Sequence, residues 1–345
     1  MAPAAGATFR ASISTETPSR QFRSWYHIRA GAMRGAPTPV IVTVTCNAKL
    51  NLFLKVYGKR PDGFHDIISI MQSIGLADTL VMEDSDNEGI HIECTNPNVP
   101  VDESNLVWKA AKLLLKETGR RAGGLRVRIE KNIPMMGGLA GGSTDGAGAL
   151  VGLNRLWKLG LEDEQIIRLA ARIGSDAPFC VVGGTSLVRG RGDVVEPLPE
   201  GIAHGSLAGG AFMLVLPPVQ IETKRAYDIL DESRHTQVRK WEALTSEYTE
   251  ILDGWVRAIA DGAIPAMFHN DFADPVFDSN PGLGAVYNNL RNTAGHAVLS
   301  GSGSSMFAWF DRAADAIEAR DRYMPVAGEM VIVVYPVDEG VSIEG

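Results

Sequence analysis

Hydrophobic residues along this chain follow two periods, one typical of strands and one typical of helices. Residues 40–45 and 50–57 are dominated by β-branched and aliphatic side chains, and they predict two strands that pair with each other. Residues 125–130 alternate apolar and charged side chains, as a half-buried strand does. Further short strands are predicted over 78–82, 89–94, 185–189, 212–216, 297–299, 306–310 and 329–335.

Apolar side chains at helical spacing predict the remaining elements. From Asn105 to Lys116 the apolar side chains fall on one side of a helix. A buried helix is predicted over 143–157, with Ser143 as its N-cap. Because strands and helices are mixed without regular strand–helix–strand repetition, the pattern favours an α+β fold over a doubly wound sheet. Further helices are predicted over 162–173, 223–232, 236–260, 281–293 and 312–322.

Breaks in this pattern divide the chain into three parts. Residues 197–210 are rich in proline and glycine, and we place a domain boundary there, between domains 39–204 and 205–345. Residues 1–38 carry five arginines and a single acid, Glu16. This composition fits a disordered basic extension, or a segment ahead of a true start near Met33 or later, and it also fits a plastid-type transit peptide. We favour the extension, because the segment shows no clear amphipathic helix.

Composition narrows the class of protein. A length of 345 residues suits two domains, and a formal net charge of −8 argues against a general nucleic-acid partner. No apolar run is long enough to predict a membrane span. The three cysteines form no CxxC pair, which predicts a reducing compartment without a structural disulfide or zinc site. We therefore expect a cytoplasmic protein, or an organellar one if residues 1–38 are a transit peptide. We expect it to act on a small molecule as a monomer or weak homodimer.

The segment from Lys131 to Asp145 is the strongest chemical signal in the sequence. It joins the strand 125–130 to the helix 143–157 through four glycines, and it lacks the lysine of a Walker A loop. Glycines let backbone N–H groups approach an anion, and the start of a helix adds unpaired donors and partial positive charge. A polyphosphate is the expected ligand, although a plain glycine turn would have a similar sequence. The residues expected to bind it are Pro134, Met135, Met136, Gly137, Gly138, Leu139, Ala140, Gly141, Gly142, Ser143 and Thr144.

Two charged residues, far apart in sequence, suit phosphoryl transfer, which needs positioning and charge neutralisation more than covalent chemistry. Asp176 lies in Gly-Ser-Asp-Ala-Pro and could accept the proton of a hydroxyl group. An aspartate before proline is equally suited to cap or turn the chain. Lys49 alternates with apolar residues and shares one strand face with Asn51, so both could face a site. An ordinary exposed strand lysine would explain the same pattern.

Several motifs taken together resemble the GHMP kinases, from about residue 42 to the C-terminus. Met136 and Ala140 replace glycines of the family's phosphate loop; since neither removes a backbone donor, we expect ATP binding to persist. The resemblance implies an α+β fold of two domains, the first like ribosomal protein S5 domain 2 and the second ferredoxin-like, with the active site between them. The motifs are the glycine loop, Asn-Ala-Lys-Leu-Asn-Leu at 47–52, Pro-Asp-Gly-Phe-His at 61–65, Gly-Ser-Asp-Ala-Pro-Phe at 174–179 and Leu-Ser-Gly-Ser-Gly-Ser-Ser at 299–305.

The resemblance also implies roles for single residues. It implies ATP and Mg²⁺ as cofactors, Asp176 as catalytic base and Lys49 as its catalytic neighbour. Asn51 would contact phosphate, and Asn105 would lie near the adenine. An asparagine at that position is equally suited to cap the helix that follows. The second glycine loop at 299–305 would brace the site, and the metal ligands are left unassigned.

Within the family, the chain is similar to the kinases that phosphorylate the 2-hydroxyl of a methylerythritol linked to cytidine diphosphate, in the non-mevalonate isoprenoid pathway. Phe64 and His65 match a cytidine-binding motif, in which the ring stacks on cytosine and the imidazole reads its edge. Thr223 and Tyr227 would form the other side of the cytosine site, although a core tyrosine in a helix start is an equal alternative. The rival functions are another GHMP kinase, for homoserine, mevalonate or a sugar, and a non-catalytic nucleotide-binding relative.

Overall fold

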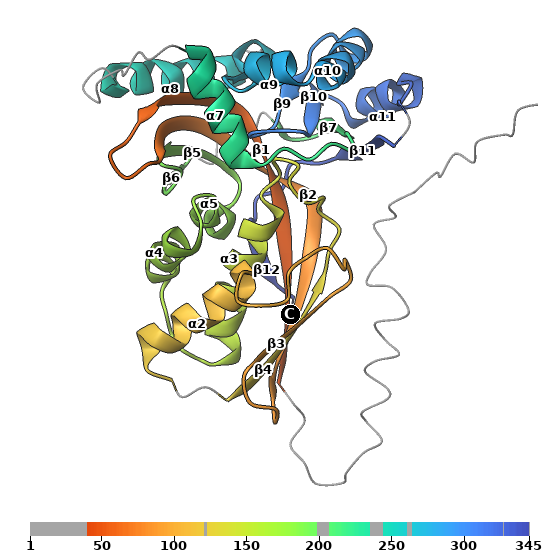
Figure 1. The fold of residues 1–345 in the computed structure, drawn as a ribbon. Helices are drawn as coiled ribbons and strands as arrows, with labels where there is room; N and C mark the ends of the chain where they lie inside the picture. Colours follow the sequence, from red (N-terminus) through yellow and green to blue (C-terminus); the bar gives the residue numbers. More distant parts are fainter. Residues whose placement is uncertain are drawn as a thin grey trace, which may run out of the picture. The chain divides into compact units, whose positions relative to one another are not determined.

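In the computed structural model, the chain from Val40 onward is built on two β-sheets (Figure 1). The predicted extension, residues 1–38, lies outside the described residues, and so do residues 199–206, where we placed the domain boundary. The mixture of sheets and helices confirms the predicted α+β class. The structure describes residues 40–120, 123–198, 207–234, 244–260, 264–326 and 328–344.

The first sheet is built on two long strands, β1 (Ile41–Lys59) and β2 (His65–Ser85), which pair antiparallel. The predicted strands 40–45 and 50–57 are therefore one strand, and the prediction that they pair with each other was wrong. Polar residues interrupt the apolar pattern without ending the strand, because their side chains bond to other segments. Asn47 Nδ2 donates to the carbonyl of Glu339, and Lys49 Nζ donates to the carbonyl of Gly138.

Shorter strands extend this sheet on both sides. The last strand of the chain pairs antiparallel with Val44–Cys46 of β1, so the C-terminus returns to the first sheet. These additional strands are β3 (Ile90–Cys94), β4 (Gly124–Glu130), β5 (Thr185–Gly190), β6 (Val194–Pro197), β8 (His269–Asn270) and β12 (Val341–Ile343). Sequence patterns missed β6, β8 and β12, which have two to four residues each, because so short a segment carries no measurable period.

Helices pack against the first sheet through a second hydrophobic core. The four helices are α2 (Leu106–Thr118), α3 (Gly141–Leu156), α4 (Asp163–Ile173) and α5 (Ala177–Val182). This core includes Leu80 and Met82 of β2, Ala110 and Leu114 of α2, and Leu150 of α3. The predicted helices in this part of the chain are confirmed, whereas the short helix after Asp176 was not predicted.

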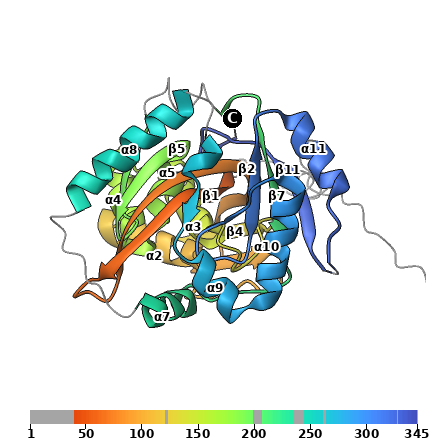
Figure 2. The ribbon, with the colours of Figure 1, turned by 90° about the horizontal axis from the view of Figure 1, so that it is seen from above.

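The second sheet is antiparallel, in the order β11 (Met330–Val334), β7 (Ala211–Leu216), β10 (Met306–Phe310) and β9 (Val298–Leu299). Seen from above, α10 and α11 lie beside the strands of this sheet (Figure 2). The helices of this part are α7 (Thr223–Arg234), α8 (Leu244–Ala260), α9 (Ala273–Ser279), α10 (Pro281–Ala294) and α11 (Ala313–Arg322), with a 3₁₀ turn at Ile264–Met267.

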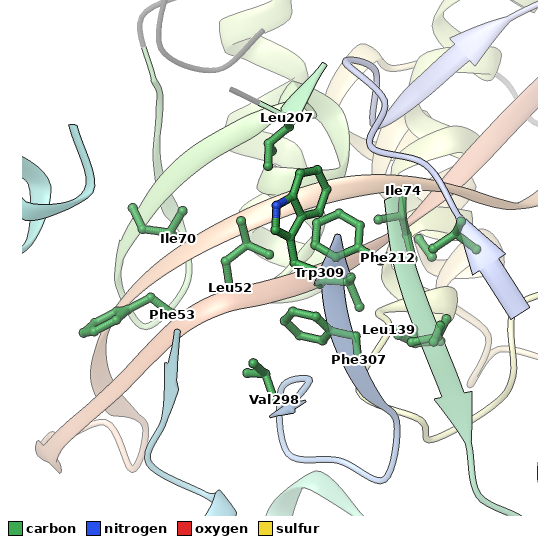
Figure 3. Packing of buried hydrophobic residues seen from close by; sticks show 14 of the residues in the cluster. Leu52, Phe53, Ile70, Ile74, Leu139, Leu207, Phe212, Val298, Phe307 and Trp309 are labelled. Carbon is green, nitrogen blue, oxygen red and sulfur yellow. The ribbon is translucent and has the colours of Figure 1, made fainter. Parts of the chain in front are cut away.

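A hydrophobic cluster joins the two sheets and fixes the glycine loop between them (Figure 3). Leu52 of β1 and Phe212 and Phe307 of the second sheet belong to it. Leu139, in the middle of the glycine loop, is buried in the same cluster. Burial of one leucine side chain contributes about 1.5–3 kcal/mol. The loop is therefore held by its side chain while its backbone remains available to a ligand.

Candidate active site

A cavity of about 230 Å³ lies beside the glycine loop. Most of that loop lines it, although Met135, Gly141 and Thr144 do not. Gly301 and Ser302 of the second glycine loop complete its wall, and sequence analysis did not assign them ligand contact. The other predicted site residues in the wall are Lys49, Asn51, Asp176, Thr223 and Tyr227.

Lys49 and Asp176 face each other across this cavity. The distance from Lys49 Nζ to Asp176 Oδ2 is 3.8 Å. The Lys49 side chain is only 4% exposed, so it is not the exposed strand lysine that the pattern alone allowed. Burial lowers the pKa of the Lys49 ammonium, and the charge of Asp176 opposes this shift. An ion pair at the wall of a cavity is an arrangement suited to proton and phosphoryl transfer.

The orientation of Lys49 is fixed by a chain of hydrogen bonds. Its Nζ donates to Asn51 Oδ1 at 2.6 Å and to the carbonyl of Gly138 at 2.8 Å. Asn51 Nδ2 donates in turn to Ser69 Oγ at 2.9 Å, and Ser69 donates to the carbonyl of Phe53 at 2.6 Å. Two of the three ammonium protons of Lys49 therefore form hydrogen bonds within the protein, and the third is available to a ligand in the cavity. Ser69 had no signal in the sequence.

Asp176 occupies the N-cap position of α5 without capping it. No hydrogen bond joins its side chain to the start of that helix. The carboxylate is about one-third exposed and lies in the cavity wall. The helix-capping alternative that the sequence allowed is therefore not what this side chain does.

Helix α3 begins with an exposed row of backbone donors. Its N-cap is Ala140, so the predicted N-cap at Ser143 was wrong and the helix starts at Gly141. Ala140 takes a left-handed conformation, with φ of 59°, and no side chain caps the helix. The N–H groups ahead of Thr144 have no acceptor within the helix. Unpaired donors and the partial positive charge of a helix start form an anion site.

The two glycine loops brace each other by direct backbone contact. A Cβ at Gly138 would overlap the carbonyl oxygen of Ser300, which explains the need for glycine at this position. The N–H of Ser305 donates to the carbonyl of Gly137 at 3.2 Å, and Ser300 Oγ donates to the carbonyl of Gly138 at 3.1 Å. Each loop therefore fixes the shape of the other.

The residues expected to bind cytidine lie together only in part. The His65 ring stacks on the Tyr227 ring with centroids 4.7 Å apart, and His65 Nε2 lies 2.9 Å from Asp231 Oδ1. Phe64 is 46% exposed, and the guanidinium of Arg191 lies 5.2 Å above its ring. Neither Phe64 nor His65 lines the cavity. Asp231 is a partner of His65 that the sequence did not reveal.

Two further contacts concern Thr223 and Asn105. Thr223 Oγ1 lies 3.2 Å from Ser302 Oγ at the cavity wall. Asn105 caps α2, since its Oδ1 accepts the N–H of Val107 at 2.9 Å and its Nδ2 donates to the carbonyl of Pro100 at 2.6 Å. The capping role is confirmed, and contact between Asn105 and adenine remains a prediction.

Sequence analysis missed a charged network beneath the glycine loop. Lys131, which we read only as the start of the loop, is buried between Asp78 and Asp145. Its position directly before the loop was the available signal. Within the described ranges, no three side chains of His, Cys, Asp or Glu are grouped so that they could hold a metal ion. The same part of the chain has no helix with the length and apolar character of a membrane span.

Comparison with known proteins gives consistent results over most of the chain. Residues 105–184 match the family described as GHMP kinases N terminal domain, and residues 257–325 match GHMP kinases C terminal. The first match contains the glycine loop and Asp176, and the second contains the loop at 299–305. A 4-diphosphocytidyl-2-C-methyl-D-erythritol kinase of Nostoc sp. is 35% identical over 311 residues, which cover 86% of this chain and 96% of the relative.

Solved structures have the same fold. A crystal structure of 4-(cytidine 5′-diphospho)-2C-methyl-D-erythritol kinase has a TM-score of 0.64 and 27% identity, and the alignment covers 85% of this chain and 99% of that chain. Homoserine kinase from Cytophaga hutchinsonii has a TM-score of 0.67 at 18% identity, and its alignment covers 90% of this chain and 100% of that chain. At that identity the second likeness shows the fold alone.

Proposed function

The chain belongs to the GHMP kinase family, and we propose that it transfers the γ-phosphate of ATP to the 2-hydroxyl of 4-diphosphocytidyl-2-C-methyl-D-erythritol. The observation that carries this proposal is that the wall of one cavity contains both the start of α3 and the pair Lys49–Asp176. The acceptor is inferred from relatives named for this kinase, of which one matches over 96% of its length. The predicted fold of two GHMP kinase domains agrees with both family matches.

On the acceptor side, Asp176 takes the proton of the 2-hydroxyl as the oxygen attacks the γ-phosphorus. The new O–P bond forms while the bond from the γ-phosphorus to the bridging oxygen breaks, and ADP leaves with that electron pair. Lys49 stabilises the negative charge that develops on the attacking and phosphoryl oxygens. Because Asn51 and Gly138 hold the ammonium, it needs no reorganisation during the reaction.

On the nucleotide side, the chain supplies backbone donors. The uncapped start of α3 and the flanking glycine loop would bind the β- and γ-phosphates. Among the residues that line the cavity, Asp176 is the one with an acidic side chain. With one carboxylate available, an Mg²⁺ ion would be held mainly by the phosphates and water. Such an ion would neutralise phosphate charge and screen it from the attacking oxygen.

The cytidine end of the substrate is placed on His65, Tyr227 and Phe64. The rings of His65 and Tyr227 stack on each other, and Tyr227 forms part of the cavity wall. The pair therefore lies beside the cavity. Phe64 offers a largely exposed ring that a base could cover. The presence of both Lys49 and Asp176 supports a catalyst over a non-catalytic nucleotide-binding relative.

A coupled assay of ADP release tests this function. The purified protein is given ATP, Mg²⁺ and one of four alcohols: 4-diphosphocytidyl-2-C-methyl-D-erythritol, homoserine, mevalonate or galactose. We expect release of ADP that depends on the cytidylyl substrate and a product phosphorylated on the 2-hydroxyl, identified by phosphorus NMR. A higher kcat/KM with any of the other three alcohols would contradict the proposed acceptor but would leave the kinase chemistry intact.

A further inference from the structure

Three charged side chains form a buried network directly beneath the glycine loop. Lys131 Nζ donates to Asp78 Oδ2 and also, at 2.7 Å, to Asp145 Oδ2. None of the three side chains is more than 4% exposed. Asp78 lies on β2, Lys131 follows β4, and Asp145 lies in α3, so the network ties three elements together.

This network holds both ends of the loop. Asp78 Oδ1 accepts the backbone N–H groups of Asn132 at 2.6 Å and Ile133 at 2.8 Å, which fixes the chain where it enters the loop. Asp145 lies in the first turns of α3, where the chain leaves the loop. Since Lys131 joins these two carboxylates, the separation of the loop ends depends on its charge.

The ammonium of Lys131 also lies close to the anion site. A Cβ built on Gly141, the first residue of α3, would be 3.0 Å from Lys131 Nζ. The network therefore lies against the same helix turn whose residues Gly142 and Ser143 line the cavity. A change in its net charge acts on a bound phosphate at short range and through a poorly hydrated medium, where Coulomb interactions are strong.

The charges in the network are not balanced, because two carboxylates share one ammonium. Burial raises the pKa of Asp145 to about 7, with Lys131 opposing this shift and Asp78 adding to it. Burial lowers the pKa of Lys131, but Asp145 and Asp78 outweigh burial, so the net shift is upward and Lys131 stays charged. Asp145 Oδ1 is buried and has no hydrogen-bond partner among the described residues. Proton exchange is therefore expected at Asp145.

The other titratable groups that face Asp145 are thiols. Cys46 on β1, Cys94 on β3 and Cys180 on α5 all interact with its charge. Burial raises the pKa of each thiol, so all three stay neutral near pH 7. Of Asp145 and these three thiols, Asp145 is the group whose pKa lies near neutrality.

We propose that the Asp78–Lys131–Asp145 network positions the phosphate loop and makes its affinity for ATP depend on the protonation of Asp145. With Asp145 protonated, the charge of Lys131 favours the bound phosphates. With Asp145 ionised, the network is net negative and opposes them. Asp145 is thus a positioning residue that acts through the loop, and the inference rests on the proposed ATP site.

Titration calorimetry with a non-hydrolysable ATP analogue and Mg²⁺ tests this inference. Wild type is compared with Asp145→Asn, which keeps the shape of the side chain but cannot ionise. We expect the ratio of the wild-type Kd to the variant Kd to be close to unity at about pH 6 and roughly five- to tenfold at about pH 8. The protonation of the ligand itself cancels in this ratio.

Two controls separate charge from structure. Asp84→Asn changes an exposed carboxylate farther along β2, and it should behave as wild type at both pH values. Lys131→Met leaves two buried carboxylates without a counter-ion, so it should weaken binding at about pH 8. Adding Asp145→Asn to Lys131→Met should restore part of that affinity, and a folded double variant without such recovery would overturn the proposal.

The possible failures are distinguishable. If the ratio of the wild-type Kd to the Asp145→Asn Kd is the same at both pH values, the proposed role of the network is wrong and the kinase function is unaffected. If the wild type binds no nucleotide at either pH, both the network role and the proposed function are wrong. Circular dichroism melting of each variant, measured at the same pH values, identifies any variant that has unfolded.

Discussion

Asp176 occupies the N-cap position of α5 but makes no capping hydrogen bond there. An aspartate at an N-cap usually accepts an N–H of the first helical turn, which stabilises a helix by about 0.5–2 kcal/mol. Asp176 makes no such bond and instead lies 3.8 Å from Lys49. Pro178 is the second residue of α5. Because proline has no backbone N–H, the first turn of the helix has fewer donors that need a cap.

Replacement of Asp176 by asparagine should therefore remove activity and leave stability unchanged. We expect Asp176→Asn to lower kcat by a factor on the order of 10² to 10⁴, because a positioned proton acceptor is lost. The affinity for ATP should change little. Steady-state kinetics combined with thermal melting checks this, and turnover near that of wild type in a folded variant would exclude Asp176 as the base.

His65 is expected to act on the acceptor alone. Loss of a hydrogen bond to a buried base edge typically costs about 1–3 kcal/mol, so His65→Ala should raise the KM for the cytidylyl substrate roughly five- to 150-fold. The KM for ATP should hardly move. Because His65 also stacks on Tyr227 and bonds to Asp231, the melting temperature must be measured too.

The control for His65 is Asp231→Asn, which keeps the imidazole ring while altering its partner. We expect that variant to change the KM of the cytidylyl substrate less than His65→Ala does. An equal rise in KM for both substrates would mark His65 as structural. No rise for either would remove the cytidine assignment.

Ala140 carries backbone strain that glycine would relieve. It has a φ of 59°, a conformation that costs an ordinary residue roughly 1–2 kcal/mol. Ala140→Gly should raise the free energy of unfolding by about 0.5–1 kcal/mol, since part of the gain is offset by the greater freedom of glycine in the unfolded chain. Urea unfolding measures this. Lys158→Gly is a matched control outside the loop, with a φ of 52°. A loss of stability in Ala140→Gly would show that the alanine methyl group makes a necessary contact.

At the scale of elements, the start of α3 is where we propose that the phosphates of ATP bind. A Cβ at Gly142 would meet nothing within 4 Å, and this residue lines the cavity. A Cβ at Gly141 would instead lie against Ile133 and Lys131, inside the protein. The two neighbouring glycines thus have different surroundings: Gly142 lines the cavity, and Gly141 permits close packing against Ile133 and Lys131.

Gly142→Val should block the anion site without disturbing the core. The branched side chain would project into the cavity, so we expect the affinity for a non-hydrolysable ATP analogue to fall by at least about tenfold, or about 1.4 kcal/mol. The melting temperature should drop only slightly, as expected for valine near a helix start. Calorimetric titration is the measurement, and affinity equal to that of wild type would argue against phosphate binding at this turn.

At the scale of the whole molecule, the C-terminal strand closes the first sheet beneath the active site. β12 pairs with Val44–Cys46 of β1, three residues before Lys49. A Cβ at Gly340 would overlap the carbonyl of Cys180 in α5, the helix that follows Asp176. The last strand therefore contacts β1, which carries Lys49, and α5, which directly follows Asp176.

Gly340→Ala should lower stability and activity together. An added methyl group in a fully packed contact typically costs about 1–3 kcal/mol, and the displacement would be transmitted to α5. Denaturant unfolding and kcat are the two measurements. Gly282→Ala, in α10, has open space at the same atom and should be neutral or slightly stabilising. Equal behaviour of the two variants would show that the tail does not constrain α5.

The sequence by itself determined the elements whose signal is local. Helices α2 and α4 and strand β4 follow from apolar periodicity, and the binding loop follows from its glycines, because both patterns depend on neighbouring residues only. The resemblance carried by Lys49, Asp176 and the two glycine loops pointed to the family, and the two family matches confirm it.

Only the tertiary structure decided which charges meet and which conformations are imposed on the backbone. The network of Asp78, Lys131 and Asp145 joins residues up to 67 positions apart, and no local pattern records such a contact. The sequence left a gap between the predicted strands 40–45 and 50–57, because the partners that keep Asn47 and Lys49 in a single strand, Glu339 and Gly138, lie far away in sequence. The physical reason is that burial and hydrogen bonding of polar groups depend on what packs around them, whereas periodicity depends only on the chain itself.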